Sequence, residues 1–403
     1  MKAIYFDKNI PRFLATKALR PVWPGVIWSP ISPSGVEQIP DPPLPGPRWL
    51  RVRNRQCGIC ATDLSLLYVK ADPRIAPAAL PGIRRVYLGH EAVGEVTETG
   101  PAVDRFRVGD RVVIEARPVS SPNCLTQEID PPCRFCAGGD TRLCENSSLG
   151  NGPVGTGSGW SDSYTAHQSE VWPVPDDLND DQASLIEPMA VAAHGVLRRL
   201  PAPGDRVLIL GAGIIGLLTL QVLKALAPQA HVTILVRYAH QGQAAKRLGA
   251  EEVISDRGDI YAKSAEITGA KYYRSQLNRG MLLGGYDLVY DCVGDRYTLR
   301  DSLRLARAGG AVVLVGISLN PLSLDTSPVW FQEVDLLGAK TFGMESLNGR
   351  ALHTFDLVIE MLQEGALSAG GLITHRFPFQ QYRKAIATAS NKRSGSIKVT
   401  LTF

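Results

Sequence analysis

Short apolar runs separated by turns dominate the first half of the chain. Candidate strands cover residues 50–52, 92–97 and 111–115, the last directly after the turn Val108-Gly109-Asp110. This spacing is typical of an antiparallel, barrel-like β domain. Ahead of it, residues 21–47 are rich in proline and almost free of helical periodicity. They predict a long irregular excursion over the surface.

The pattern changes from Asp205 onward, where apolar runs alternate with helical stretches. Such alternation predicts parallel α/β structure. The connection from residue 260 to 285 is longer than one helix needs, which indicates an insertion. The expected strands are 207–210, 232–236, 252–254, 288–291, 311–315 and 336–339, followed by a helix over 352–363 and a terminal strand over 397–403.

Composition limits the class of protein. A chain of 403 residues is too long for one typical core, so two domains are expected. With 44% hydrophobic and 20% charged residues it has the balance of a soluble globular protein. The net charge of +4, without a dense basic run, gives no support to a nucleic-acid or acidic-membrane partner.

Nothing at the start of the chain resembles a secretory signal, so a cytoplasmic location is expected. The uncharged stretch 207–223 nearly reaches the length of a membrane span. Its three glycines and its strand-turn-helix pattern argue against a membrane role.

A glycine-rich turn follows the first α/β strand, in the order Gly211-Ala212-Gly213-Ile214-Ile215-Gly216. Between a strand and a helix, GxGxxG indicates a dinucleotide-binding loop, because glycines allow the tight turn and the close approach of a pyrophosphate. The helix N-terminus then presents free N–H groups to the phosphates. A glycine-rich turn without a ligand is the alternative. The residues expected to contact the cofactor are Gly211, Gly213, Ile214, Ile215, Gly216, Arg237, Val293, Val315 and Gly316.

The acid expected about 20 residues later, which would bind the ribose hydroxyls, is missing. Val236 stands about where it should be, and Arg237 follows. An arginine can pair with a 2′-phosphate through its charged fork. The sequence therefore favours NADP over NAD; the alternative is that Arg237 stacks on the adenine or points to solvent.

Three ligand types of a catalytic zinc occur in separate motifs. Cys57-Gly58-Ile59-Cys60-Ala61-Thr62-Asp63 supplies thiols, Gly89-His90-Glu91 an imidazole and a carboxylate, and Glu187-Pro188 another carboxylate. A catalytic zinc uses such ligands and keeps one position open for water or substrate. Taken singly each motif is ambiguous, since Cys57 and Cys60 also fit a redox pair and His90 a core histidine.

In this combination the chain resembles the zinc-containing medium-chain dehydrogenases, especially their polyol, threonine and glucose dehydrogenase branch. The resemblance covers nearly the whole chain from Leu50. It implies an α/β protein with a GroES-like β-barrel catalytic domain (1–186 and 343–403) and a Rossmann domain with a doubly wound parallel sheet (187–342). The implied reaction is hydride transfer between an alcohol or polyol, or its carbonyl form, and NAD(P). The motifs that carry it are residues 58–63, Gly89-His90-Glu91, the downstream cysteines, Glu187-Pro188, the glycine loop and the strand 397–401.

The resemblance assigns Cys60 and His90 as zinc ligands. Glu91 is implied as a direct ligand or as a carboxylate that moves on and off the metal. Glu187 stands where the alcohol dehydrogenase branch has a cysteine ligand, and a glutamate there is the polyol pattern, bound directly or through water. Cys57 takes a structural role. A zinc ion in such a site lowers the pKa of a coordinated alcohol or water.

Further roles follow from the same resemblance. Asp63 is expected to orient His90, while His194 is expected to be a packing or cofactor-side residue rather than a ligand. Thr62 matches the family's proton-relay hydroxyl, so Thr62, Ser65 and Glu91 are the candidate catalytic residues. Ser65 stands where many relatives have histidine, and a serine can pass on a proton but cannot store one near neutral pH.

Seven cysteines occur, four of them between residues 124 and 144. In a reducing compartment such a cluster indicates a metal site more than disulfides. Cys133, Cys136 and Cys144 match the last three members of the family's structural zinc lobe, C-x2-C-x2-C-x7-C. Asp130 takes the first position, so the fourth ligand is open between Cys124, which is favoured, Asp130, and no bound metal at all.

Other readings are a zinc-free quinone or enoyl reductase on the same fold and a non-enzymatic, NADPH-binding zinc protein. Neither needs Cys60, His90, Glu91 and Glu187 together with Thr62. A homodimer or homotetramer is an expectation from the family. Trp23 and Trp28 either line a substrate pocket or, as is favoured, anchor the excursion to the core. The expected substrate is a small alcohol or carbonyl compound.

Overall fold

The computed structural model describes residues 1–72, 85–115, 122–147, 156–274 and 280–403. Contacts between Cα atoms divide the chain into two compact units, Met1–Glu187 with Ile373–Phe403, and Pro188–Leu372. The sequence predicts that the chain returns to the first domain at residue 343. This division places the return at Ile373, 30 residues later. Residues 343–372 stay with the second unit through bonds such as the reciprocal pair between Gln221 and Ser368, at 2.9 and 3.1 Å.

The first unit is built on a seven-stranded sheet in the order β19-β20-β3-β5-β6-β8, with β7 paired to β3. Side chains along β3 alternate between the core and solvent, as a half-buried strand requires. The three strands predicted from the apolar pattern are confirmed by β3, β5 and β6. The strands are β3 (Trp49–Gly58), β5 (Ala92–Thr99), β6 (Arg111–Ile114), β7 (Ser163–His167), β8 (Val171–Pro173), β19 (Ile373–Pro378) and β20 (Lys398–Thr402).

Strand pairing brings the C-terminus of the chain beside the first cysteine motif. Strand β20 runs antiparallel to β3, with Thr400 opposite Gly58 and Leu401 opposite Cys57. Lys398, two residues before Thr400, therefore comes next to the segment that follows Gly58. Beyond β3, that segment leads through Cys60 into helix α2 (Ala61–Leu67).

The segment before β3 is more ordered than predicted. It contains helix α1 (Ile10–Leu19), the 3-10 helix η1 (Pro24–Trp28) and strand β2 (Ser34–Gln38). Strand β2 pairs with β1 (Lys2–Asp7) in a second sheet, β2-β1-β4, where β4 is Arg85–Tyr87. The expectation of a long irregular excursion over 21–47 was wrong for η1 and β2, because elements of five residues are too short to leave a periodic signal.

The two tryptophans of this segment have different surroundings. Trp28 packs edge-on against Tyr382 of α12 (Tyr382–Ser390), with ring centroids 5.6 Å apart, and Arg383 lies over its ring. Trp23 is 46% exposed. Trp28 thus anchors the segment to the rest of the unit.

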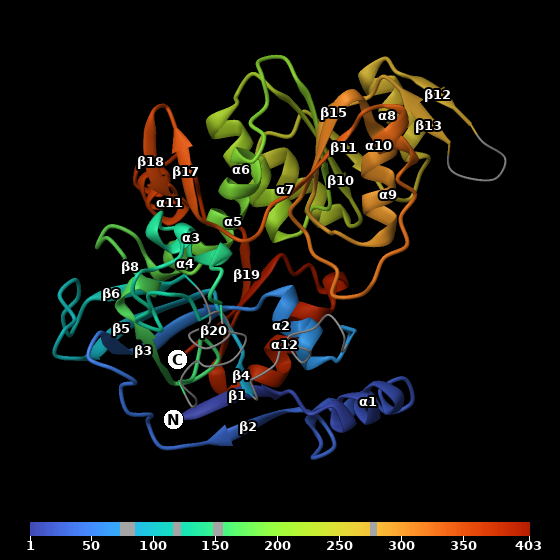
Figure 1. The fold of residues 1–403 in the computed structure, drawn as a ribbon. Coiled ribbons are helices and arrows are strands. Elements are labelled where there is room, and N and C mark those ends of the chain that lie inside the picture. The colour runs from blue at the N-terminus through green and yellow to red at the C-terminus, as the bar shows by residue number, and fades with distance from the viewer. Residues whose placement is uncertain (73–84, 116–121, 148–155, 275–279) are drawn as a thin grey trace. The chain divides into compact units, whose positions relative to one another are not determined.

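The second unit is a six-stranded parallel sheet in the order β11-β10-β9-β14-β15-β16 (Figure 1, green to orange). Numbered along the chain, this order is 3-2-1-4-5-6, the doubly wound arrangement of dinucleotide-binding domains. All six predicted strands are confirmed. They are β9 (Arg206–Leu210), β10 (His231–Val236), β11 (Glu252–Ser255), β14 (Tyr286–Asp291), β15 (Ala306–Leu314) and β16 (Asp335–Gly338), with helices α6 (Ile214–Leu226), α7 (Ala239–Arg247), α8 (Ile260–Thr268) and α9 (Arg296–Leu305) between them.

The predicted insertion contains α8 and the antiparallel hairpin of β12 (Lys271–Tyr273) and β13 (Met281–Leu283). The unit ends with α10 (Ser327–Phe331), the hairpin of β17 (Met344–Leu347) and β18 (Arg350–His353), and α11 (Thr354–Gln363). The apolar stretch 207–223 is divided between β9 and α6. Among the described residues, no helix combines the length and apolar character needed to cross a bilayer.

Candidate active site

Cys60, His90 and Glu91 meet in the first unit. One ligand atom from each, a thiol sulfur, an imidazole nitrogen and a carboxylate oxygen, lies within 4.8 Å of the others. Cys60 is the N-cap of α2, and the other two residues lie between β4 and β5. The close spacing of these three donor types is what a catalytic zinc ion requires.

Two neighbours orient these donors. The carboxylate of Asp63, on α2, is fully buried; its Oδ2 lies 3.3 Å from His90 Nδ1, and its Oδ1 accepts the Gly89 N–H at 3.1 Å. This contact occupies Nδ1 and so leaves Nε2 as the ring nitrogen for a ligand. The Thr62 hydroxyl donates to Cys60 Sγ at 3.2 Å.

Glu91 is paired with a buried lysine. Both of its carboxylate oxygens lie 2.6 Å from Lys398 Nζ, and both side chains are almost fully buried. Burial acts to lower the pKa of Lys398, but the negative charges of Glu91 and Cys60 outweigh it and raise that pKa. The ammonium therefore stays charged and holds a compensating positive charge beside the metal-type donors.

Gly58 makes room for this pair. A Cβ atom at Gly58 would lie 1.9 Å from Glu91 Oε2, so no larger residue fits without moving the carboxylate. The Gly58 N–H also donates to the Glu91 carbonyl at 2.8 Å, which holds the two segments together. The glycine of the cysteine motif is thus required by close approach.

Other expected site residues take separate places. Cys57 is fully buried and donates to the Gly58 carbonyl at 3.3 Å; burial and the nearby Glu91 raise its pKa well above the usual range, which suits a structural thiol. Glu187 is buried in the first turn of α5 (Ile186–Leu197) and acts electrostatically on Lys398, but it lies outside the group of three donors. Ser65 donates to the Ala61 carbonyl at 2.9 Å.

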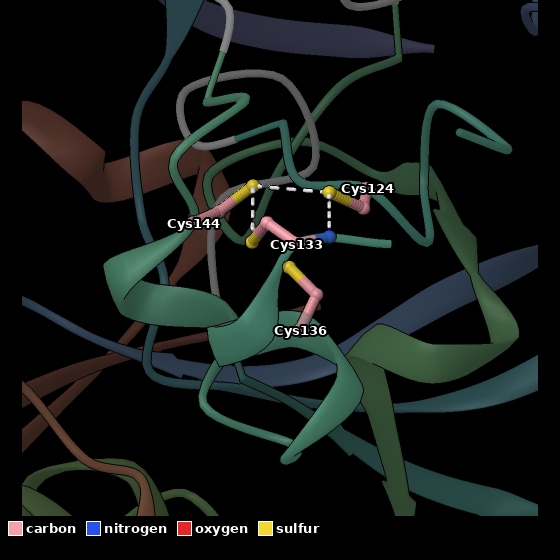
Figure 2. Close-up of side chains that lie close together, drawn as sticks. All are labelled: Cys124, Cys133, Cys136 and Cys144. Atoms are coloured by element: carbon pink, nitrogen blue, oxygen red, sulfur yellow. Dashed lines mark hydrogen bonds between the residues drawn. The ribbon is translucent and has the colours of Figure 1, made fainter. Parts of the chain in front are cut away.

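The four cysteines of the downstream cluster converge in the same unit. Their sulfur atoms all lie within 4.8 Å of one another (Figure 2). The sulfur of Cys144 is 3.6 Å from that of Cys124 and 4.0 Å from that of Cys133. Zn–S bonds of 2.3 Å in a tetrahedron imply sulfur separations of about 3.8 Å. The cluster has the dimensions of a closed four-thiolate zinc site.

Cys124 therefore completes the cluster, whereas Asp130 is exposed and lies outside it. The Cys124 sulfur accepts the Cys133 N–H at 3.3 Å and an Asn146 side-chain N–H at 3.4 Å. Backbone N–H groups of Cys136 and Glu145 lower the pKa of Cys133 to about 6. Such N–H donors favour thiolates, the form that binds zinc.

In the second unit the glycine loop has the geometry of a phosphate cradle. Gly211 adopts a φ of 98°, and a Cβ at Gly216 would lie 1.8 Å from the Gly211 carbonyl oxygen. A Cβ at Gly213, the N-cap of α6, would meet no protein atom within 4 Å. Gly211 and Gly216 thus allow the turn and the helix packing, and Gly213 leaves open space in front of the helix N-terminus, where Ile214 and Ile215 begin the first turn.

The remaining expected cofactor contacts lie at the carboxyl ends of neighbouring strands. Val293 follows β14, and its Cγ2 would be 2.4 Å from a Cβ at Gly211. Gly316 follows β15, where a Cβ would be 2.4 Å from the carbonyl carbon of Val293, and the Val315 N–H donates to the Asp291 carbonyl at 3.0 Å. These residues surround the point where strand order reverses, at which open α/β sheets bind their ligands.

Arg237 has a partner that the sequence analysis missed. Its Nε donates to the Asp256 carboxylate at 2.6 Å, while 70% of its side chain is exposed. The Asp256 N–H donates to the Val236 carbonyl, which places this acid beside the end of β10. The sequence signal that could have revealed this partner is an acid one residue beyond the third strand of the parallel sheet. His194, by contrast, is buried in α5 and bonds Glu345.

Comparisons with known proteins agree with this geometry. Residues 46–176 match the sequence model described as alcohol dehydrogenase GroES-like domain, and residues 215–363 match that described as zinc-binding dehydrogenase. L-idonate 5-dehydrogenase of Vitis vinifera is 30% identical over 361 residues, covering 89% of this chain and 88% of its own. The chain belongs to the zinc-type medium-chain alcohol dehydrogenase family.

Other relatives extend this finding. Sorbitol dehydrogenase of Arabidopsis thaliana is 28% identical over 366 residues, with 89% of each chain covered. The crystal structure of 2R,3R-butanediol dehydrogenase from Bacillus subtilis has the same fold, with a TM-score of 0.70 at 22% identity and coverage of 100% of this chain and 99% of the other. This member of the family is an NAD(P)-dependent oxidoreductase of the zinc-type alcohol and polyol dehydrogenases.

Proposed function

We propose that the enzyme transfers hydride between a hydroxyl carbon of a polyol or sugar acid and NADP, with zinc held by Cys60, His90 and Glu91. The observation that carries this proposal is the convergence of a thiol, an imidazole and a carboxylate within 4.8 Å. When bound, zinc supplies a Lewis acid for the alcohol oxygen, and the nicotinamide supplies the hydride acceptor. The substrate class rests on the relatives named for L-idonate and sorbitol.

The residues around that ion have different roles. Asp63 holds the ring of His90 through Nδ1, which fixes its tautomer and orientation. Lys398 holds Glu91 by both oxygens, and each of these oxygens keeps a further lone pair with which Glu91 can bind the ion. Glu187, buried in the same unit, is the second carboxylate of the polyol pattern and acts directly or through water.

Proton transfer starts from Thr62. Its hydroxyl bonds Cys60 Sγ, which places it beside the reacting oxygen's position, and a hydroxyl both accepts and donates a proton. Ser65 is one turn further along α2 and bonds the Ala61 carbonyl, so it must rotate away from the helix to take part. We propose Thr62 as the first relay group and Ser65 as the second.

A second zinc ion is proposed in the four-cysteine cluster. Four sulfur atoms at these distances close a tetrahedral site, which replaces apolar burial in a small lobe. Its thiols must remain reduced, and a reducing compartment such as the cytoplasm satisfies this.

NADP is the proposed cofactor because a cation, and no acid, ends β10. Arg237 is largely exposed. Asp256 binds its Nε, so the two terminal nitrogens of the guanidinium remain available to a 2′-phosphate. Asp256 lies near enough to weaken this preference. It does not reverse the preference, since its charge is compensated by the arginine.

A homo-oligomer formed through the second unit is the proposed assembly. Trp330 and Phe331 on α10 are 77% and 71% exposed, and Leu336 on the neighbouring edge strand β16 is also exposed. Large apolar side chains and an edge strand are features that soluble proteins cover with a partner. Sedimentation of wild type and Trp330→Asp, which should dissociate, tests this.

The experiment that tests the function combines metal analysis with a panel of polyols and sugar acids assayed with both cofactors. Cys60→Ser and His90→Ala should abolish turnover and leave cofactor binding intact, because the glycine loop lies in the other unit. Turnover of a quinone or an enone that survives both changes would favour the zinc-free reductase. Stoichiometric zinc and cofactor without turnover of any alcohol would favour a non-enzymatic binding protein.

A further inference from the structure

Helix α2 ends in an unusual cap. The Val69 N–H donates to the Leu66 carbonyl and the Lys70 N–H to the Ser65 carbonyl, both at 2.9 Å. This is the two-bond Schellman pattern, whose central residue must adopt a left-handed conformation and is usually glycine. Here it is Val69, fully buried, with a φ of 46°. A β-branched residue is strained in this region and stays there only where surrounding contacts hold it.

Two cations, Lys17 of α1 and its C-cap residue Arg20, bind the backbone on either side of this valine. An Arg20 guanidinium N–H donates to the Tyr68 carbonyl, directly before Val69. Lys17 Nζ donates to the Ala71 carbonyl, two residues after it, at 3.1 Å. Cations at the C-terminal end of a helix also interact favourably with its dipole. The strained cap is thus bonded from both sides by one neighbouring helix.

Helix α1 is itself fixed firmly. Asn9 caps its first turn by accepting the Arg12 N–H at 3.0 Å, and Phe13 is fully buried against Phe6. The Thr16 hydroxyl donates to the Ile31 carbonyl, which ties α1 to the chain that follows it. All of these residues precede residue 46, where the match to the family's catalytic domain begins.

We propose that Lys17 and Arg20 are positioning residues of this chain, which hold the C-terminal end of α2 so that its N-terminal end presents Cys60, Thr62 and Asp63 in register. The proposal rests on the proposed metal site, since those residues are its proposed ligand, relay and orienting group. A seven-residue helix transmits a shift at one end to the other, because its internal hydrogen bonds make it nearly rigid. Helix α1, which precedes the proline-rich excursion over 21–47, therefore helps to position the site.

The test compares Lys17→Met/Arg20→Met with Arg12→Met. Arg12 is an exposed cation on the same helix, so its loss removes charge without touching α2. Two readouts are measured: hydrogen exchange of α2 amides in the protein as purified, and the absorption spectrum of the cobalt-substituted enzyme, whose ligand-field bands report donor geometry. The double variant should exchange about tenfold faster in α2, shift the cobalt bands of the catalytic site and lower kcat with KM little changed. The cysteine cluster should keep its metal.

A second pair of variants addresses folding and the origin of the effect. Arg20→Lys, made in place of Arg20→Met in the double variant, keeps a donor for the Tyr68 carbonyl. It should restore much of the kcat that the double variant loses. Val69→Gly removes the strain and, placed in the double variant, should slow α2 exchange again. Exchange and spectra unchanged in the double variant, or changed equally by Arg12→Met, would overturn the proposal. A wild-type spectrum without a catalytic-site band would refute the metal assignment instead, while amide exchange would still decide whether α1 holds α2.

Discussion

Both carboxylate oxygens of Glu91 lie 2.6 Å from the ammonium nitrogen of Lys398, although 307 residues separate the two in sequence. The pair is almost completely buried beside Cys60 and His90. Two opposite charges in such a place compensate each other, and either one alone would be a desolvated charge next to the proposed metal site. The pair therefore couples the terminal strand β20 to the site.

Loss of one partner should be costly. Lys398→Met leaves the Glu91 carboxylate buried without its counter-charge, and breaking a buried pair in this way typically destabilises a protein by about 3–5 kcal/mol. We expect a lower urea midpoint and loss of zinc. Glu91→Gln/Lys398→Met should recover much of the stability but not the activity. Lys263→Met, which breaks the exposed pair with Glu266, is the control and should leave the free energy of unfolding nearly unchanged. Equal effects of the two lysine changes would refute the buried-pair argument.

The cysteine cluster predicts two zinc ions per chain. Cys124→Ser should remove the ion of the lobe and leave the other, because Cys124 Sγ lies in the group of four. Asp130→Ala should leave both ions in place, since that carboxylate is exposed and outside the group. Zinc content by mass spectrometry and the melting temperature check this. A single zinc in the wild type, or loss of zinc in the aspartate variant, contradicts the assignment.

Local patterns were enough to predict the strands of the parallel sheet and the glycine loop. Val207 to Leu210 is an apolar run with a glycine turn after it, and both signals lie within a few neighbouring residues. The three donors Cys60, His90 and Glu91 also follow from motifs, because family likeness supplies the long-range contacts that a single sequence does not show.

The partners of the site residues could not be predicted in the same way. Lys398 reaches Glu91 only through the register of β20 on β3, and Asp256 reaches Arg237 only through the pairing of β11 with β10. Strand register depends on tertiary packing and leaves no local signal. Helix α1 was not predicted for a related reason. Only Phe13 and Thr16 of its ten residues are fully buried, so its sequence gives little helical periodicity.

A buried aspartate at the end of β14 predicts a pH dependence of stability. Burial raises the pKa of Asp291 to about 6, although the N–H groups of Val293 and Gly294 donate to it. A raised carboxyl pKa means that the folded state binds the proton more tightly than the unfolded state does. The stability contributed by the protonated form is therefore complete below about pH 4 and is lost as the pH rises through 6.

Asp291→Asn keeps an acceptor for both N–H groups but carries no charge. Relative to the wild type, the free energy of unfolding of the variant should increase as the pH rises from 4.5 to 7. The increase should be about 1–3 kcal/mol for a shift of roughly two pKa units. Melting temperatures of both proteins across this range check the sign. A difference in melting temperature that is constant with pH, or that shifts in favour of the wild type as the pH rises, would show that Asp291 is ionised without cost in the folded protein.

Cofactor choice depends on the balance between Arg237 and Asp256. A charge-assisted bond from Arg237 to a 2′-phosphate is worth about 1.5–3 kcal/mol, or roughly ten- to a hundredfold in affinity. Wild type should therefore bind NADPH more tightly than NADH, and Arg237→Ala should remove most of the difference while leaving NADH binding unchanged. Calorimetric titration with both reduced cofactors measures this without turnover. Arg257→Ala, which removes an exposed cation one residue beyond Asp256, is the control for net charge.

Asp256→Asn separates the two roles of the acid. Its carboxylate orients Arg237 through a 2.6 Å bond to Nε, and it also places a negative charge near the phosphate position. If repulsion dominates, the asparagine variant binds NADPH more tightly, because the amide oxygen still accepts from Nε and the charge is gone. If orientation dominates, NADPH affinity falls toward that of Arg237→Ala. We expect the first result, since the arginine is already directed by the backbone at the end of β10, where its N–H donates to Gln241 at 3.2 Å. A clear preference of the wild type for NADH would instead mean that Asp256 serves the ribose hydroxyls and that Arg237 only neutralises it.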